Sequence, residues 1–540
     1  MPDSYDYIII GSGSAGCVAA CRIIERTNAK VLLLEAGGSD DDKFIRMPAG
    51  VPRVIPTKTW AYETEAEAPT LNRRMFVGQG KVLGGSSSVN GMIYIRGQRE
   101  DYDGWRDAYG CTGWDYDSLL PYFIRSEANE SLSNQYHGTS GPLPVSENRF
   151  RHPLSMAFIR AAQESGLPYV VDFNGASQEG AGWYQTTTRN GERASTAQTY
   201  LKQVANSANL DLQLDALVQR IIIEDGRATG VVYSRKNGPP VTVFARAEVI
   251  LAAGAIGSPK VLLLSGIGPQ RELQQMGIAP VADLPVGENY HDHLHLSVNS
   301  ATPAPTTLDG QDKGLKALRN GVEWMLFRSG VVSSNILEAG AFIDTAGDGR
   351  PDAQIHFLPL LDRWDDPDGI TNNYRHGLTL KVGHLRPKAR GRLRLASRDP
   401  HDMVKIHANL LGHPDDVAGQ IRAAKAALKI AHSPSLQAVA PETFSPVPTS
   451  FDAGGAPVYA DADLETWVRR TCKTVYHPVG TCRMGTDPAD SVVDLSLRVH
   501  KISGLRVIDG SVFPHVTSGN TNAPVIAVAE KAMDLLLGNR

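Results

Sequence analysis

Short apolar runs alternate with a helix-forming segment at the start of the chain. Residues 7–10 (YIII) and 31–34 (VLLL) are unbroken hydrophobic runs, typical of strands that are buried on both faces of a parallel sheet. The small apolar residues between them predict a helix over residues 17–26. This strand–helix–strand order indicates a βαβ unit and therefore a parallel sheet near the N-terminus.

Further strands and helices are expected in the middle and at the end of the chain. The patterns predict strands over residues 211–214, 245–253, 391–395 and 505–508, and helices over residues 415–432 and 523–537. Residues 249–268 are apolar enough to resemble a membrane span, but Pro259, Lys260 and several glycines interrupt them. We therefore expect a strand, a turn and a helix in this stretch.

The amino-acid composition excludes several classes of protein. The net charge of −4 over 540 residues leaves no broadly basic surface, so no nucleic-acid partner is expected. Hydrophobic residues make up 42% and charged residues 21% of the chain, which excludes wholesale disorder. The five cysteines include no C-x-x-C pair, so neither a disulfide framework nor a cysteine-based zinc site is expected. No basic segment precedes the first strand, so we expect no signal peptide and a cytoplasmic protein.

Glycine is over-represented, and its placement indicates a dinucleotide site. The chain has 52 glycines. Gly11, Gly13 and Gly16 follow the first predicted strand and open the predicted helix, as in the G-x-G-x-x-G fingerprint. Glu35 ends the next strand, where a carboxylate can accept hydrogen bonds from an adenosine ribose. This fingerprint alone fits FAD and NAD equally well.

Longer motifs resemble one known family. Residues 80–90 (GKVLGGSSSVN) and 254–268 (GAIGSPKVLLLSGIG) resemble the two signature patterns of the glucose–methanol–choline (GMC) oxidoreductases, which use FAD. Residues 476–485 (YHPVGTCRMG) and 519–524 (GNTNAP) are also similar to that family. Within it, shorter segments resemble the bacterial alcohol dehydrogenase branch, which includes L-sorbose, aliphatic alcohol and choline dehydrogenases.

The resemblance implies an α/β fold of interleaved domains. A Rossmann-like FAD-binding domain would comprise residues 1–154, 205–300 and 473–540. An α+β substrate domain, built on an antiparallel sheet, would comprise residues 155–204 and 301–472. The dinucleotide-type elements at both ends and in the middle of the chain agree with such a discontinuous arrangement.

The resemblance also implies a chemistry. Family members oxidise alcohols by removing a hydroxyl proton and transferring a hydride to flavin N5. The position of the family's active-site base falls on His477, and the position of its His or Asn partner falls on Asn520. A neutral imidazole suits a base near neutral pH, and an amide can hold the substrate oxygen. The expected reaction converts a primary alcohol to its aldehyde.

The family pattern implies a set of cofactor contacts. These fall on Gly11, Gly13, Ser14, Ala15 and Gly16 at the pyrophosphate, Glu35 and Ala36 at the ribose, Val218 at the adenine, Trp60, Asn90, Gly91, Met92 and Ile93 at the isoalloxazine, and Val82, Gly85, Asp509, Gly510, Asn520 and Thr521 elsewhere. Some members link FAD covalently through a histidine at the position of Val89. Valine has no nucleophile, so we expect noncovalent FAD.

Two local features admit other interpretations. His291, His293 and His295 alternate, so on a strand they would share one face, as metal ligands can. The surrounding residues resemble a family segment that carries no metal, and we predict no metal site. Glu338 is either a partner for a substrate cation such as choline or a structural residue.

Several functional alternatives stay open. Hydroxynitrile lysis and nonenzymatic FAD binding compete with alcohol oxidation, because some relatives keep FAD without net redox chemistry. The expected electron acceptor is a quinone or another non-oxygen acceptor, with an oxidase that forms hydrogen peroxide as the alternative. The expected partners are therefore a small alcohol and this acceptor, and any contact with the inner membrane would be peripheral. The alcohol carrier, whether sugar, polyol, aliphatic, aromatic or choline, is not predicted.

Overall fold

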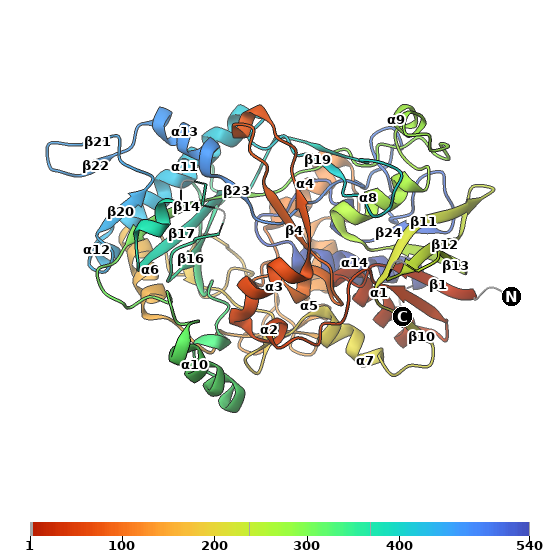
Figure 1. The fold of residues 1–540 in the computed structure, drawn as a ribbon, viewed down its shortest axis with the longest axis horizontal. Helices are drawn as coiled ribbons and strands as arrows, with labels where there is room; N and C mark the ends of the chain where they lie inside the picture. Colours follow the sequence, from red (N-terminus) through yellow and green to blue (C-terminus); the bar gives the residue numbers. More distant parts are fainter. Residues whose placement is uncertain (1–3, 237, 365, 368, 539–540) are drawn as a thin grey trace.

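The first sheet carries the predicted βαβ unit. The computed structural model describes residues 4–236, 238–364, 366–367 and 369–538, so the first three residues of the expected N-terminal segment lie outside it. Parallel pairing joins β10, β2, β1, β13 and β24 in that order, and β11 and β12 continue the sheet beyond β13 in antiparallel pairing. Their bounds are β1 Ser4–Ile10, β2 Val31–Leu34, β10 Leu210–Gln213, β11 Ala216–Glu224, β12 Arg227–Arg235, β13 Val241–Leu251 and β24 Leu505–Val507. Figure 1 shows this sheet at the end of the molecule that holds the N-terminus.

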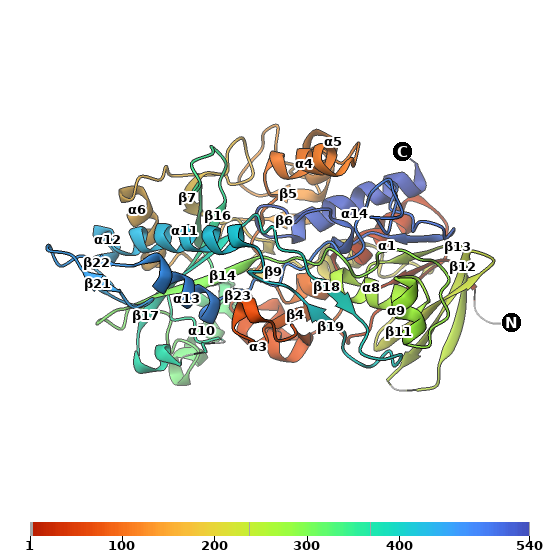
Figure 2. The same cartoon turned by 90° about the horizontal axis from the view of Figure 1, so that it is seen from above.

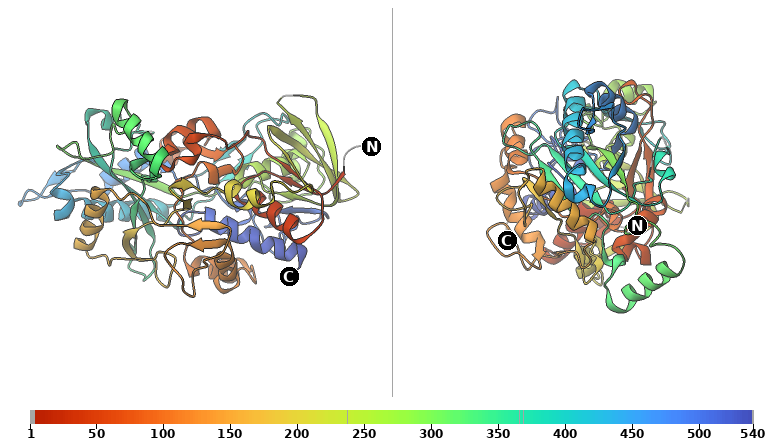
Figure 3. Two further views of the ribbon diagram at one scale, coloured as in Figure 1. Left: turned by 90° about the horizontal axis from the view of Figure 1, so that it is seen from below. Right: turned by 90° about the vertical axis from the view of Figure 1, so that its left-hand side faces the viewer.

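α1 (Ser14–Arg26) packs on the first sheet together with helices from later parts of the chain. α1 follows β1 and packs against α14 (Asn522–Leu537), which in turn packs against α5 (Tyr116–Ser126). The chain therefore returns to its N-terminal unit at its C-terminal end, and both termini lie beside this sheet (Figure 3). The predicted helices over residues 17–26 and 523–537 are confirmed, with α1 beginning three residues earlier than its pattern indicated.

The second sheet is antiparallel and lies at the other end of the molecule (Figure 2). Its strand order is β20-β14-β17-β16-β15-β7, and β23 also pairs with β14. Their bounds are β7 Gly180–Trp183, β14 Leu294–Ala301, β15 Ala339–Ile343, β16 Ala353–Leu358, β17 Gly377–His384, β20 Glu442–Ser445 and β23 Lys473–Thr474. α11 (Pro414–Ala431) packs on β14 and β17, and α6 (Pro153–Glu164) packs on β15. This architecture confirms the predicted fold class.

Sheet membership bears on the proposed domain boundary after residue 300. β14 pairs with β17 over Leu296 to Ala301, so it belongs with the second sheet although the sequence placed most of it in the first domain. We therefore propose a boundary before β14. The apolar residues 249–268 form the end of β13 and α8 (Gly254–Leu264), as expected. Among the described helices, none combines the length and hydrophobicity that crossing a bilayer requires.

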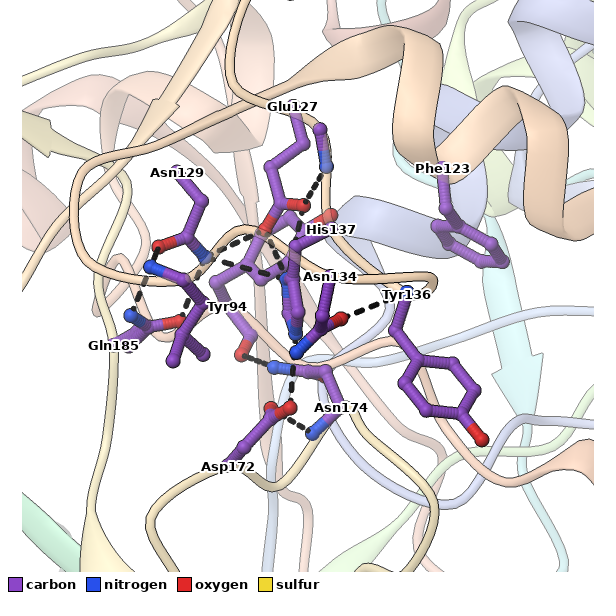
Figure 4. A network of polar contacts seen from close by, with 12 residues as sticks. Tyr94, Phe123, Glu127, Asn129, Asn134, Tyr136, His137, Asp172, Asn174 and Gln185 are labelled. Carbon is purple, nitrogen blue, oxygen red and sulfur yellow. Dashed lines mark hydrogen bonds and ion pairs between the residues drawn. The ribbon is translucent and has the colours of Figure 1, made fainter.

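A network of charged side chains joins three segments that are separate in sequence (Figure 4). His137 lies between Glu127, whose Oε2 is 3.0 Å from Nδ1, and Asp172, whose Oδ2 is 2.9 Å from Nε2. Arg96 donates from Nη2 to Glu127 at 2.6 Å. Both ring nitrogens face carboxylates, so the doubly protonated imidazolium satisfies the site best. Because Arg96 follows residues 90–93 closely, the network also supports the segment expected beside the flavin.

His137 should make stability depend on pH. Burial lowers its pKa, but hydrogen bonds with Asp172 and Glu127 outweigh this and leave the pKa above its usual value. A raised folded-state pKa gives stability that is present below the unfolded pKa and is lost as pH rises through the folded pKa. His137→Gln should lower the free energy of unfolding by about 3–5 kcal/mol at mildly acidic pH, and by less at alkaline pH.

Chemical unfolding from about pH 5.5 to about pH 9 would measure this difference. His401→Gln, at an exposed histidine, is the matched control and should leave the curve unchanged. A difference between His137→Gln and the wild type that stays constant over this range would contradict the imidazolium assignment.

Candidate active site

A cavity of about 400 Å³ lies between the two sheets. This volume is in the range of small-molecule sites. At one end it is lined by the turn after β1 and the end of β2, and at the other by side chains of the second sheet, including His295, His356 and Lys381. The cavity therefore joins the glycine fingerprint to the antiparallel sheet.

Each glycine of the fingerprint has a different geometric role. Gly11 has a φ of +96°, and a Cβ there would lie 2.6 Å from the Ala252 carbonyl oxygen. A Cβ on Gly16 would lie 1.9 Å from the Gly11 carbonyl oxygen, so Gly16 lets α1 start against the turn. Gly13 lines the cavity, and a Cβ on it would meet nothing closer than 3.9 Å. No side chain caps α1, so its first N–H groups are available to an anion such as a pyrophosphate.

Glu35 is fixed at the end of β2 as a hydrogen-bond acceptor. Its Oε2 accepts from the backbone N and the Oγ of Ser12, at 2.9 and 2.7 Å, and its Oε1 accepts from Gly37 N at 2.7 Å. Burial raises the pKa of Glu35, and these hydrogen bonds act in the opposite direction. The carboxylate lines the cavity and keeps lone pairs for a ribose. Ser12, the unspecified residue of the fingerprint, orients Glu35, a role that the sequence pattern did not indicate.

The second glycine cluster packs directly on the first. Gly85 has a φ of +53°, and a Cβ there would lie 2.6 Å from the Gly13 Cα. Gly85 lines the cavity, whereas Val82 is fully buried in a cluster with Ile45 and Val54 and does not line it. A cofactor contact through the Val82 side chain therefore has no support in the geometry.

A buried arginine that sequence analysis missed supports Asn90. Arg193 donates from Nη1 to Asn90 Oδ1 at 2.9 Å and to the Ser87 carbonyl at 3.2 Å. Burial lowers the pKa of Arg193 to about 9. The same Asn90 oxygen accepts from Met92 N at 3.0 Å, and Met92 has a φ of +60°. These contacts hold the backbone of residues 90–93 against the cavity, although no local pattern marks Arg193 for this role.

The predicted catalytic residues lie together at the second-sheet end of the cavity. Asn520 Nδ2 is 3.4 Å from His477 Nε2, and Gln354 Nε2 donates to Asn520 Oδ1 at 3.3 Å. The backbone N of His477 donates to Asp292 Oδ1 at 2.8 Å. Since Gln354 occupies the amide oxygen, the NH₂ group of Asn520 faces His477 and the cavity.

Hydrogen bonding determines which nitrogen of His477 carries the proton. His293 Nε2 lies 2.9 Å from the Leu385 carbonyl, to which it can only donate. A neutral His293 therefore has a bare Nδ1, which lies 3.2 Å from His477 Nδ1 and accepts its proton. His477 Nε2 is then left unprotonated, and its lone pair faces the Asn520 amide and the cavity. Burial lowers the pKa of His477 well below its usual value and that of His293 to about 3, so both rings are neutral near pH 7.

The other predicted cofactor residues can be placed in the same way. Those that line the cavity are Gly11, Gly13, Ser14, Ala15, Glu35, Ala36, Trp60, Gly85, Asn90, Gly91, Met92, Ile93, Val218, Asp509, Gly510, Asn520 and Thr521. Gly16 and Val82 lie behind the cavity wall. Asp509 Oδ2 accepts from Gly254 N at 2.8 Å and from Ser258 Oγ at 2.5 Å, which joins the start of α8 to β24.

The three alternating histidines do not share a strand face. β14 begins at Leu294, so only His295 lies on it, and the geometric premise of the metal hypothesis was wrong. His291 Nδ1 lies 2.7 Å from the Asn289 carbonyl, and its Nε2 accepts from Val516 N at 2.9 Å. His293 bonds Leu385 and His477 instead. Within the described residues, no group of three or more side chains is arranged to hold a metal ion.

Glu338 lies outside the cavity lining and has structural partners. Its Oε2 accepts from His152 N at 2.6 Å and from Ser155 Oγ at 3.0 Å, and its Oε1 accepts from Ser334 Oγ at 2.6 Å. The side chain is fully buried. Of the two interpretations of Glu338, these contacts favour the structural one.

Comparison with models of protein families identifies the family to which the chain belongs. The N-terminal model of the GMC oxidoreductases matches residues 5–295, and the C-terminal model matches residues 387–529. The chain therefore belongs to the GMC oxidoreductase family, whose members depend on FAD, and the predicted resemblance is confirmed.

Individual relatives cover the whole chain. It is 41% identical to the oxygen-dependent choline dehydrogenase of Vibrio vulnificus, over 99% of this chain and 95% of the relative. It is 39% identical to the alcohol dehydrogenase (acceptor) of Pseudomonas putida, over 99% and 96%. Among solved structures, pyridoxine 4-oxidase from Mesorbium loti superposes with a TM-score of 0.87 at 30% identity, covering 99% of both chains. Formate oxidase from Aspergillus oryzae superposes with a TM-score of 0.90 at 26% identity, covering 99% of this chain and 98% of that one.

Proposed function

We propose that the protein oxidises a primary alcohol to its aldehyde with FAD as hydride acceptor. The observation that carries this proposal is the pair of His477 Nε2 and Asn520 Nδ2, 3.4 Å apart, at the end of a cavity whose other end is a dinucleotide cradle. The residues fit FAD, because the open N-terminus of α1 suits its pyrophosphate and Glu35 suits its ribose. When bound, FAD would supply the hydride acceptor that the reaction needs.

The protein's own groups would prepare the alcohol. His477 accepts the hydroxyl proton at Nε2, the nitrogen that His293 leaves unprotonated. The NH₂ of Asn520 donates to the oxygen that becomes negative as the proton leaves. Lys381 lines the same end of the cavity and adds a positive charge that favours an alkoxide. Each role requires only groups that the fold already holds in place.

His293 should act as a positioning residue. Replacing it by Ala removes the acceptor for His477 Nδ1–H, so both tautomers become accessible, and we expect the limiting rate of flavin reduction to fall at least about tenfold with little change in KM. His293→Asn keeps an oxygen acceptor and should recover part of the rate. Equal losses in both variants, or a change in KM alone, would assign His293 a packing role.

The charges around the reacting end favour a neutral or anionic alcohol over a quaternary ammonium. Lys381 and Lys473 both contact Asp362, at 3.0 and 3.1 Å, so two cations share one carboxylate. The carboxylates in the described lining are Glu35 and Asp509, which belong to the cofactor part. Lys81 already lies over the Trp60 ring, 4.0 Å from its centroid. A substrate cation would therefore meet positive charge and lack a cage to offset it.

An orphan polar atom indicates what the substrate carries. The Nε2 atom of His295 is buried, lines this end and has no hydrogen-bond partner within the described chain, while the His356 imidazole lies beside Asn520. Buried polar atoms are usually satisfied, so a ligand with polar groups is the natural partner. This favours a hydroxylated or otherwise polar alcohol over a plain aliphatic one.

The acceptor is proposed to be a quinone or another non-oxygen acceptor. The similarity to an alcohol dehydrogenase (acceptor) supports it. Aerobic turnover with and without an artificial dye would test it, because an oxidase would form hydrogen peroxide at the rate of substrate turnover.

Anaerobic stopped-flow reduction of the flavin by an alcohol panel tests the proposed function directly. The panel should include polyols, hydroxy acids, aliphatic alcohols and choline. We expect bleaching by a polar primary alcohol and slow or no bleaching by choline. No bleaching by any alcohol would contradict alcohol oxidation and leave lysis or nonenzymatic binding.

FAD should be released intact by acid. Val89 lines the cavity at the position where some family members carry a covalently linked histidine, and its side chain cannot form that bond. Acid precipitation should therefore leave the yellow chromophore in the supernatant. A yellow pellet would show a covalent link through another residue.

A further inference from the structure

One helix presents an apolar face to solvent. α10 (Gly314–Phe327) projects from the body of the molecule (Figures 1 and 3). Five of its exposed large apolar side chains are Leu315 (83%), Leu318 (63%), Val322 (45%), Met325 (66%) and Leu326 (69%), and a sixth, Phe327 (70%), ends the helix. Their spacing places these five on one side of the helix. A contiguous exposed apolar surface of this kind is typical of an interaction site, whereas a single exposed leucine is common on protein surfaces.

The opposite side anchors α10 to the protein. Asn320 and Trp324 are buried there, and Trp324 Nε1 donates to the Gly191 carbonyl at 2.8 Å. Asn320 Nδ2 donates to the Gln311 carbonyl at 3.1 Å. The helix is therefore held in a definite orientation, with its apolar side turned away from the core.

Positive charge borders the apolar side. Lys313, Lys316 and Arg319 lie at the start of α10, and no ion pair joins them to an acidic residue in the described part of the chain. The first turn holds no acidic residue, and no side chain caps it. The N–H groups of that turn add to the positive potential of the three side chains. This border suits phosphate groups.

We propose that α10 docks the protein on a lipid bilayer that contains anionic headgroups. An amphipathic helix with aliphatic residues on one side and Lys or Arg beside them lies in the plane of a membrane interface. A projecting, convex helix can sink into deformable lipid, whereas a protein partner would have to supply a matching groove. A symmetric dimer through this face would bring the three unpaired cations of each copy together. Charge and shape therefore favour the bilayer.

Docking would orient the cavity. α10 packs against the turn η5 (Val331–Ser333), and η5 packs against η1 (Pro48–Gly50), which leads into α3 (Val51–Lys58). Val51 and Ile55 of α3 line the cavity. The wall near the flavin segment would thus lie close to the bilayer, where lipid-soluble quinones reside. This last consequence rests on the proposed acceptor, but the docking itself does not.

Vesicle co-sedimentation of the FAD-loaded full chain tests the docking. The probes are vesicles of phosphatidylcholine alone and of phosphatidylcholine with phosphatidylglycerol. We expect binding to the anionic vesicles, at least about tenfold weaker binding to the neutral ones, and a similar loss for the double variant Leu318→Asp, Met325→Asp. Lys316→Glu, Arg319→Glu should weaken binding to anionic vesicles only.

A matched control distinguishes docking through α10 from nonspecific vesicle binding by any exposed apolar residue. Phe451 is 66% exposed on the hairpin of β21 (Ser450–Phe451) and β22 (Pro457–Val458), which lies at the end of the molecule away from the first sheet (Figure 1), and Phe451→Asp should bind vesicles normally. All variants should reduce a soluble dye with alcohol at the wild-type rate, because none touches the cavity.

Several results would overturn the proposal. These are equal binding to both vesicle types, no binding to either, and loss of binding in Phe451→Asp rather than in the α10 variants. A dimer in sedimentation that Leu318→Asp, Met325→Asp converts to a monomer would assign the face to a second copy of the chain. Failure of flavin reduction with intact vesicle binding would refute the proposed function alone.

Discussion

His477→Ala is expected to slow anaerobic reduction of bound FAD by about 10²–10⁴-fold. The variant loses the imidazole whose Nε2 lone pair faces the cavity and Asn520. Asn520 can still donate to the substrate oxygen, but an amide cannot take its proton. Stopped-flow absorbance of the flavin under saturating alcohol would measure the change.

The controls for this variant concern loading and folding. The FAD spectrum and the thermal transition should match those of the wild type, because His477 belongs to none of the hydrophobic clusters in the described part of the chain. His401→Ala, at an exposed position, should reduce flavin at the normal rate. A folded, FAD-loaded His477→Ala enzyme with near-normal reduction would remove His477 from the chemistry.

Gly16→Ala is expected to impair cofactor binding because the added methyl group would displace the turn after β1. The new Cβ would lie 1.9 Å from the Gly11 carbonyl oxygen, which is backbone and cannot rotate away. Overpacking of this kind costs about 1–3 kcal/mol. Because cofactor binding needs the turn in its native form, we expect about 5- to 150-fold weaker FAD affinity.

A second glycine provides the comparison. Gly104 lies inside α4 (Arg99–Tyr109), and a Cβ there would meet nothing within 4 Å. Gly104→Ala should bind FAD normally and be slightly more stable, since alanine favours helix. Titration of the two apoproteins with FAD would compare them. Equal affinity in both variants would show that the turn after β1 does not contact the cofactor.

The local sequence pattern was sufficient to predict β1, β2 and the glycine turn that follows β1. The runs at residues 7–10 and 31–34 are apolar because both faces of β1 and β2 are buried, so their state could be predicted from composition alone. The glycines at 11 and 16 were recognisable because a tight turn and a close helix approach leave no room for a side chain. At these positions, the local sequence itself carries the signal for the observed structure.

The remaining features depend on contacts that are distant in sequence. The tautomer of His477 depends on His293 and on the Leu385 carbonyl, which lies 92 positions from His293. Arg193 reaches Asn90 across 103 positions. The alternation of His291, His293 and His295 suggested a shared face, but β14 starts only at Leu294, and alternation carries no meaning outside a strand. Val82 matched a motif whose neighbours line the cavity, while its own side chain packs on Ile45 and Val54.

The Leu385 carbonyl has a consequence for how this enzyme can diversify. It belongs to the main chain just after β17, so almost any residue at 385 would present the same oxygen to His293. The position of the proton on His477, the proposed catalytic base, therefore depends on where the backbone runs and not on the identity of the side chain at 385. If His477 removes the substrate proton as proposed, side chains of the second sheet could change without altering this tautomer, as long as β17 keeps its register.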